Sequence, residues 1–302
     1  MRWQSGGRSG NLEDRRGSRA GGMGGLGGLP LGRGGGIGGV IVMLVLAILG
    51  GSRVLGGGGG GGFQIEDVLN QIPAAQAPAG GQPLPGAPDP DAKLVDFVSF
   101  VLDDVQTMWA EQFRAGGQRY GDAKLVLFTA AVSSGCGQAS SETGPFYCQL
   151  DRTVYVDLEF FRELSRRFKA PGDFAQAYVI AHEIAHHVQN ELGIANRVRA
   201  LREKNPDDSN ELSVRQELQA DCLAGVWAHS TYQRGILEAG DLEEGLGAAA
   251  AVGDDRIQKS VTGRVDPESF THGTSEQRMT WFRRGFENGD ADNCDSFAAD
   301  EI

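Results

Sequence analysis

One stretch of the chain, AYVIAHEIAHHVQNEL at residues 177–192, contains three of the five histidines in the sequence. An apolar run precedes the histidines, and the periodicity predicts a buried helix over residues 174–192 that ends at Gly193. His182 and His186 lie four residues apart, so both imidazoles project from one face of this helix. Because buried histidines need polar partners, the fold has to bring other polar groups against that face.

Two imidazoles with this spacing can bind one metal ion. His182, Glu183 and His186 form the pattern H-E-x-x-H, in which two histidines bind zinc and the glutamate acts as general base toward a water molecule. A polar helix face exposed to solvent is the alternative interpretation. The apolar run FAQAYVIA before the motif argues against that alternative, because it indicates a buried helix.

A catalytic zinc site needs a third protein ligand. His187 projects about 100° away from His186 and is therefore a poor partner. No histidine follows at the spacing of the longer motif H-E-x-x-H-x-x-G-x-x-H. His229 is interpreted as an ordinary histidine on a helix surface, and His272 and nearby carboxylates remain candidates.

The segment VRQELQADCLAGVWA offers two carboxylates, Glu217 and Asp221, one helical turn apart. Glu217 would complete a site of two histidines and one glutamate, a set known for catalytic zinc. Asp221 would accept the free N–H of a ligating imidazole and fix its tautomer. A pair of surface carboxylates is the alternative, although the neighbouring residues on that side are apolar.

Glycine is unevenly distributed, with 25 of 46 glycines in the first 62 residues. Composition therefore predicts four regions. They are a disordered, Gly/Arg-rich cytoplasmic tail (1–33), a transmembrane anchor (34–55), a Gly/Pro-rich linker (56–90) and a folded domain (91–302).

The predicted anchor rests on 19 uncharged residues between Arg33 and Arg53. A helix of this length roughly matches a bilayer core of about 30 Å, and the upstream arginines favour a cytoplasmic N-terminus. The sequence thus predicts a single-pass protein of the cell membrane with its folded domain outside the cytoplasm. A cleaved signal peptide and a protein without membrane attachment are the alternatives.

The folded domain is predicted to be α+β and mostly helical, with a small sheet. An amphipathic helix opens it at residues 91–113, where apolar residues recur three and four apart. Short apolar stretches between turn residues predict strands. The expected strands lie within 124–132, 145–151 and 153–161, and the further helices span 211–232, 242–252 and 275–287.

Four cysteines are present, and none forms a C-x-x-C pair that would suggest a cysteine zinc site. An even number outside the cytoplasm fits two disulfides. Among the three possible connectivities, Cys136–Cys148 and Cys222–Cys294 are the expected pairs, and four buried free thiols are the alternative. The formal net charge of −12 argues against a nucleic-acid partner, which would require a basic surface.

The two motifs AHEIAHHVQN and ELQADCLAGVWA together resemble the gluzincin arrangement, H-E-x-x-H followed by E-x-x-x-D. More closely, the chain resembles the bacterial family of neutral zinc metallopeptidases. The segments GPFYCQLDRTVYVDLEFF, AAAAVGDDRIQ and THGTSEQRMTWFRRGF support the resemblance, which covers most of Asp91 to Ala299. It implies a zincin-like domain in which His182, His186 and Glu217 bind one Zn²⁺ ion and Glu183 is catalytic.

Hydrolysis by this chemistry also needs a group that stabilises the developing oxyanion. Many gluzincins use a downstream histidine or tyrosine, so His272 is the candidate and Tyr232 the alternative. A histidine bonded only to backbone is the competing interpretation of His272. A substrate peptide would add as a strand to a sheet edge supplied by TVYVDLEFF or GPFYCQL.

The expected function is that of a membrane-anchored zinc endopeptidase acting on peptides or proteins outside the cytoplasm. A non-catalytic, zinc-stabilised binding module of the cell envelope is one alternative. Glu183 argues against it, because a structural zinc site has no use for a base. A zinc amidase acting on a non-protein substrate is another, and the sequence indicates no oligomeric state.

Overall fold

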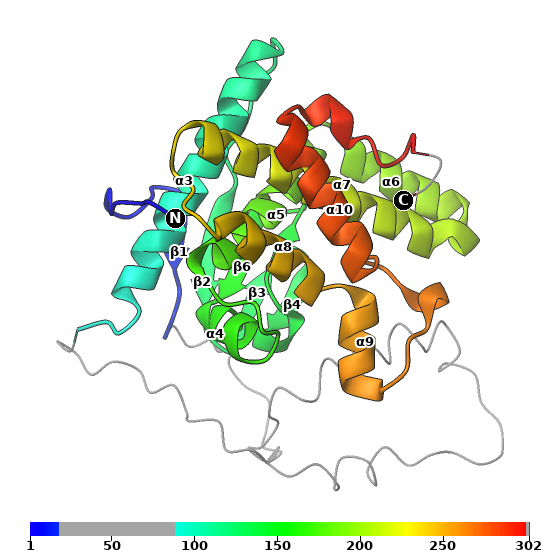
Figure 1. The fold of residues 1–302 in the computed structure, drawn as a ribbon, viewed down its shortest axis with the longest axis horizontal. Coiled ribbons are helices and arrows are strands. Elements are labelled where there is room, and N and C mark those ends of the chain that lie inside the picture. Colours follow the sequence, from blue (N-terminus) through cyan, green and yellow to red (C-terminus); the bar gives the residue numbers. More distant parts are fainter. Residues whose placement is uncertain (18–87, 300–301) are drawn as a thin grey trace, which may run out of the picture.

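A computed structural model describes residues 1–17, 88–299 and 302. This part of the chain has the predicted α+β fold, in which helices surround a small sheet (Figure 1). The four-stranded sheet has the order β1-β2-β6-β5, and β3 and β4 form a separate antiparallel hairpin. The strands are β1 Leu12–Asp14, β2 Lys124–Phe128, β3 Ala131–Ser134, β4 Gly137–Ser140, β5 Phe146–Cys148 and β6 Thr153–Asp157.

The two central strands, β2 and β6, are parallel and consist almost entirely of buried residues. Val, Leu, Tyr and Phe dominate both strands, as expected where helices cover a sheet on both faces. β1 extends the sheet in parallel beside β2, whereas β5 pairs with β6 in the antiparallel direction. β5 is therefore the edge strand at the far end of the sheet from β1.

The predicted helices are present, and three further helices were not predicted. The helices are α3 Ala92–Ala115, α4 Leu158–Arg166, α5 Asp173–Glu191, α6 Ile194–Lys204, α7 Ser209–Gln233, α8 Asp241–Ala251, α9 Asp254–Thr262 and α10 Ser275–Asn288. Four 3₁₀ turns lie at Ser141–Thr143, Pro206–Asp208, Pro267–Ser269 and Ala291–Cys294. The unpredicted helices α4, α6 and α9 are short, and each begins directly after a capping or glycine residue.

The stretch TVYVDLEFF is a strand only as far as Asp157. The Asp157 side chain accepts a hydrogen bond from the backbone N–H of Glu159 at 3.0 Å, which caps the start of α4. Leu158 to Phe161 are consequently helical rather than extended. The apolar pattern that predicted a strand continues past Asp157 in the sequence. The helix cap at Asp157 nevertheless ends the strand and starts a helix.

α5 lies at the centre of the molecule, where α3, α7 and α8 pack against it (Figure 1). Most of its side chains are buried, so the polar groups on it must be satisfied by neighbouring elements. The helix ends at Glu191, and two residues later Gly193 has a φ of 73°, in the left-handed region that favours glycine. α6 starts immediately after this residue.

α7 and α10 cross at very close range because two glycines meet there. A Cβ atom on Gly225 would lie 2.1 Å from the carbonyl oxygen of Phe282, and one on Gly285 would lie 1.9 Å from that of Cys222. Any larger residue at either position would therefore push the helices apart. This close crossing brings side chains of α10 within reach of those on α7.

Both expected disulfides are present. Cys136–Cys148 joins the β3–β4 turn to β5, and Cys222–Cys294 joins α7 to the last 3₁₀ turn. The Cα atoms are 5.8 Å and 5.5 Å apart, within the usual range for disulfides. The described residues contain no free cysteine.

The prediction of a disordered tail over residues 1–33 is wrong for residues 1–17. Leu12–Asp14 form β1, and the segment before them packs on α3. Composition alone suggested disorder, whereas pairing with a distant strand orders the segment. Residues 18–33, the expected anchor at 34–55 and the linker up to residue 87 lie outside the described residues. Within the described ranges, no helix has both the length and the apolar character needed to cross a bilayer.

Candidate metal centre

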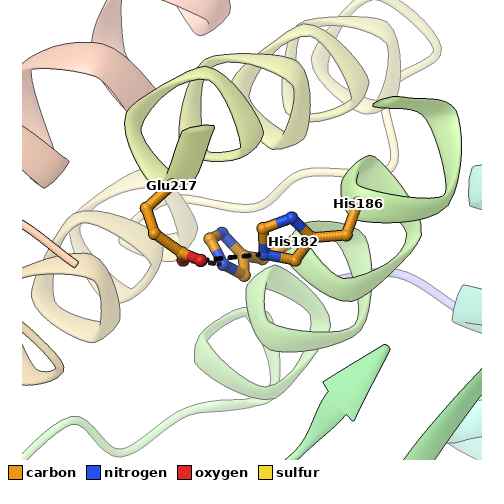
Figure 2. Close-up of side chains that lie close together, drawn as sticks. All are labelled: His182, His186 and Glu217. Carbon is orange, nitrogen blue, oxygen red and sulfur yellow. Dashed lines mark hydrogen bonds and ion pairs between the residues drawn. The ribbon is translucent and has the colours of Figure 1, made fainter. Parts of the chain in front are cut away.

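The three predicted metal ligands meet between α5 and α7 (Figure 2). His182 Nε2 lies 3.1 Å from Glu217 Oε2, and His186 Nε2 lies 3.4 Å from Glu217 Oε1. One ligand atom from each of the three residues falls within 4.8 Å of the others. Zinc ligands at about 2.0–2.1 Å in a tetrahedron lie about 3.3 Å apart. Each histidine therefore lies about this far from a Glu217 oxygen, and the three residues are close enough to share one ion.

His182 contacts Asp221, the residue one turn after Glu217 that was expected to fix the tautomer of a ligating imidazole. His182 Nδ1 lies 2.9 Å from Asp221 Oδ1. Since a carboxylate accepts hydrogen bonds, Nδ1 donates to Asp221, and without a metal Nε2 donates to Glu217 in the same way. A bound metal ion would replace the proton on Nε2 while Asp221 keeps the proton on Nδ1. Asp221 is fully buried, so its charge needs further partners.

Those further partners are Arg278 and Tyr178. Arg278, on α10, donates from Nε to Asp221 Oδ2 at 2.8 Å and from Nη2 to Oδ1 at 3.0 Å. The Tyr178 hydroxyl donates to Asp221 Oδ1 and accepts from Arg278 Nη2 at 3.1 Å. Burial alone would raise the pKa of Asp221, but Arg278 and His182 lower it below its usual value. Asp221 is therefore a charged acceptor for the His182 ring.

His186 has a separate partner on its own helix. Its Nδ1 lies 2.9 Å from the amide oxygen of Gln189, so Nδ1 donates and Nε2 again faces Glu217. Gln189 is itself fixed, because its amide nitrogen donates to the Gln216 carbonyl at 2.8 Å and to Gln219 at 3.1 Å. Both imidazoles therefore present Nε2 to the same point.

The charges around this point favour a cation. Burial alone would lower the pKa of His182, but Asp221 and Glu217 raise it to about 9. Burial alone would raise the pKa of Glu217. The neighbouring His186 and His182 outweigh this effect and bring the pKa well below its usual value. A divalent cation would take the place of the proton shared among these groups.

His182, His186 and Glu217 line a cavity of about 680 Å³. Glu183 lines it as well, from α5, and only 8% of this residue is exposed. Other lining residues come from the segment before β5, from α4, from α6 and from the loop before α10. They include Gly144, Phe146, Phe160, Phe168, Arg202 and His272.

His272 lines this same cavity and has a carboxylate partner. Its Nδ1 lies 3.2 Å from Asp254 Oδ1 and 3.0 Å from the Thr271 hydroxyl oxygen. The other carboxylate oxygen of Asp254 accepts from the backbone N–H groups of Thr271 and His272, both at 2.7 Å. Asp254 thus contacts both the ring and the backbone N–H of His272. The alternative interpretation of His272 as a histidine bonded only to backbone is therefore wrong.

The remaining aromatic and histidine candidates lie elsewhere. His187 is buried on another face of α5, where it bonds to the Gly121 carbonyl at 2.6 Å and to the Tyr147 hydroxyl at 2.9 Å. His229 is half-buried and bonds to the Phe286 carbonyl on α10 at 2.6 Å. Tyr232 is 60% exposed, packs on Phe286 and does not line the cavity. The structure therefore removes Tyr232 as the alternative to His272.

Four residues of the site were not identified from the sequence: Tyr178, Gln189, Asp254 and Arg278. Gln189 follows His186 by three residues, a spacing that places it on the same helix face. Tyr178 precedes His182 by four residues and carried the same signal. No spacing pattern in the sequence marks Asp254 or Arg278, because their contacts depend on the loop before α10 and on the crossing of α7 and α10.

We predict that Asp221→Asn weakens zinc binding about 10- to 100-fold. The amide keeps the shape of the carboxylate but loses the charge that faces the N–H of His182 and the guanidinium of Arg278. A competition titration with a chromophoric chelator measures the affinity. Asp255→Asn makes the same chemical change at another residue, on α9, and serves as the control. It should leave the zinc affinity unchanged. An unaltered affinity in Asp221→Asn would contradict the role assigned to Asp221.

Comparison with known proteins agrees with this geometry. The family model described as "Putative neutral zinc metallopeptidase" matches residues 1–297. "Uncharacterized protein YpfJ" of Escherichia coli strain K12 is 45% identical over 300 residues, 98% of this chain and 99% of that protein. "Uncharacterized protein Rv2575" of Mycobacterium tuberculosis strain H37Rv is 47% identical over 189 residues, 59% of this chain and 63% of that protein. No solved structure matches the chain.

The family match extends beyond the segments that carried the resemblance in the sequence. Those segments covered Asp91 to Ala299, whereas the family match starts at residue 1 and so includes the glycine-rich N-terminal region. The match agrees with the motifs, since H-E-x-x-H and E-x-x-x-D supply the three residues that meet in space. The chain belongs to the family of neutral zinc metallopeptidases.

Proposed function

We propose that the protein is a zinc-dependent endopeptidase with one zinc ion held by His182, His186 and Glu217. The observation that carries the proposal is the convergence of two imidazole Nε2 atoms and one carboxylate on the wall of a cavity. Three protein ligands beside a cavity are typical of catalytic zinc, whereas structural zinc has four. This difference weighs against a non-catalytic binding module.

A zinc ion bound there would supply Lewis-acid chemistry, by acidifying a water molecule and polarising the carbonyl group that is attacked. Glu183 follows the ligand His182 directly and lines the same cavity. We assign it the role of general base, taking a proton from the attacking water and delivering it to the leaving amine. A buried carboxylate in a cavity wall is suited to this role.

His272 would stabilise the oxyanion that forms on the substrate carbonyl. With Nδ1 bonded to Asp254, its Nε2 is the nitrogen available to the cavity. Burial lowers the pKa of His272, but Asp254 and then Glu217 raise it above its usual value, against a smaller opposing effect of Arg278. The protonated ring can donate a hydrogen bond to a negatively charged oxygen.

A peptide substrate is favoured over other amides by the position of β5. This edge strand and the residues before it, Thr143 to Tyr147, contribute to the cavity lining. An extended peptide can add to such an edge through backbone hydrogen bonds. The Cys136–Cys148 disulfide and the bond from Tyr147 to His187 hold β5 beside α5. Of the two edges expected from the sequence, GPFYCQL is the one at the cavity, since β6 is a central strand.

We predict that His272→Ala lowers kcat about 10²- to 10³-fold and leaves KM nearly unchanged, because the hydrogen bond forms mainly in the transition state. Steady-state kinetics on one cleaved peptide measure both constants. His229→Ala, which removes a histidine between α7 and α10, should keep the kcat of the wild type. A kcat for His272→Ala within a factor of two of the wild type would remove His272 from the mechanism.

We predict that Asp254→Asn shifts the alkaline limb of the kcat profile to lower pH. A group whose pKa is raised in the folded protein stays protonated until the pH exceeds that raised value, so activity that needs the imidazolium is lost as pH rises. Removing the carboxylate lowers the pKa of His272 and brings this loss to lower pH. An alkaline limb that stays in place would show that His272 does not act as the imidazolium.

Digestion of a peptide library by the full-length, zinc-loaded chain tests the proposed function. Cleavage should stop when a chelator removes zinc and return when zinc is added back. A library left intact, together with hydrolysis of cell-wall amides, would favour the zinc amidase instead.

We further propose that the enzyme works outside the cytoplasm, since two disulfides are typical of proteins in oxidising compartments.

A further inference from the structure

The first residues of the chain are built into the sheet of the metallopeptidase domain. Leu12–Asp14 pair in parallel with Leu125–Leu127 of β2. The backbone N–H of Leu125 donates to the Asn11 carbonyl at 2.9 Å, and that of Arg15 donates to the Leu127 carbonyl at 2.8 Å. Leu125 and Leu127 are fully buried, so without β1 these backbone groups of β2 would lose their partners.

The same segment runs beside α3 (Figure 1), and its side chains contact that helix. Trp3 packs edge-on against Phe97, with ring centroids 5.3 Å apart, and it also contacts Phe100. Ser5 and Ser9 donate hydrogen bonds to Asp96 and Asp103 on the same helix. Apolar packing, polar contacts and strand pairing therefore act along the whole segment, as expected for part of a domain.

The two points where the described chain breaks off lie together. Arg16 Nη2 donates to Asp89 Oδ2 at 2.6 Å, and the same guanidinium contacts Asp14 at 2.8 Å and Asp91 at 3.5 Å. Arg16 precedes residues 18–87, and Asp89 follows them. The two ends of the described chain that flank residues 18–87 thus lie at one place.

From these contacts we propose that residues 1–17 are a structural part of the metallopeptidase domain and lie on the same side of any membrane as residues 88–299. A single helix crossing a bilayer core of about 30 Å between residues 17 and 88 would put β1 and β2 on opposite sides. The strand pairing and the contact between Arg16 and Asp89 cannot form across that distance. A topology with residues 1–33 in the cytoplasm and the domain outside is therefore incompatible with this proposal.

Cross-linking in intact bacterial cells tests the proposal with the full-length chain. Asp122 is exposed and Asn11 is half-buried, and Asn11 Nδ2 lies 3.2 Å from Asp122 Oδ2. Asn11→Cys with Asp122→Cys therefore forms a pair for a short, membrane-permeable bis-maleimide. The expected result is a linked peptide within one chain, found by mass spectrometry. Asn11→Cys with Glu203→Cys, on the distant helix α6, is the matched control and should lose this product (Figure 1).

A second measurement gives an answer even if the pair cross-links poorly. The single variants Asn11→Cys and Glu203→Cys are treated in intact cells with a maleimide that cannot cross membranes. Both sites should react, or both should be protected and react only after lysis. Labelling of one site alone would overturn the proposal, as would cross-linked dimers that show the segment bound to a second copy. Neither outcome would bear on the zinc site, so the proposed function is tested separately.

Discussion

Replacing Glu183 by glutamine should abolish hydrolysis while zinc stays bound. Glu183 lies beside His182 and lines the cavity, but it is not among the three residues whose atoms converge on the proposed metal position. Glutamine has nearly the same shape, so packing around this buried side chain is kept, but its amide cannot take a proton from water. A general base typically contributes about 10²- to 10⁴-fold, and we expect kcat to fall by at least that range.

Two measurements on the same sample separate the loss of the base from the loss of the metal. Metal analysis of Glu183→Gln should give the zinc content of the wild type, and the peptide assay should give no cleavage above background. Glu203→Gln, on the exposed surface of α6, makes the same chemical change outside the cavity and should keep full activity. Full activity in Glu183→Gln would exclude the glutamate as base, and loss of zinc would indicate that it acts as a ligand.

The parts of this site that could be predicted from the sequence are those fixed within a single helix. His182 and His186 share a face of α5 because of their spacing, and Glu217 and Asp221 share a face of α7 for the same reason. What the spacing could not show is that these two faces oppose each other. That step came from the family resemblance and from the cost of burying charged groups without partners, and the geometry agrees with it.

The parts that could not be predicted depend on contacts between distant segments. Arg278 reaches Asp221 because Gly225 and Gly285 allow α7 and α10 to cross at close range, and no local pattern encodes that crossing. β1 shows the same limit at the level of the fold. Its three residues lie in a glycine- and arginine-rich segment with no strand periodicity, and only the free edge of β2 makes them a strand.

Replacing Glu217 by alanine should remove the metal altogether. Glu217 is the only one of the three converging residues that α7 supplies, and its two oxygens face His182 Nε2 and His186 Nε2 at 3.1 Å and 3.4 Å. Two ligands on one helical turn cannot close a site that has lost its charged third member. Loss of a residue that only orients a ligand typically weakens metal binding by at most about 100-fold. We expect the loss of Glu217 to weaken zinc binding by more than that and to abolish hydrolysis.

Glu211→Ala is the matched control, since Glu211 lies on the same helix, is exposed and pairs only with Arg215 in the described part of the chain. Zinc content after dialysis against a defined free-zinc buffer should stay at the wild-type level in the control and fall to background in Glu217→Ala. Circular dichroism would show that both variants keep their helices, so that lost metal reflects the lost ligand rather than unfolding. If Glu217→Ala retained its zinc, the third ligand would have to be sought among the other cavity residues, and His272 would be the first of them to replace.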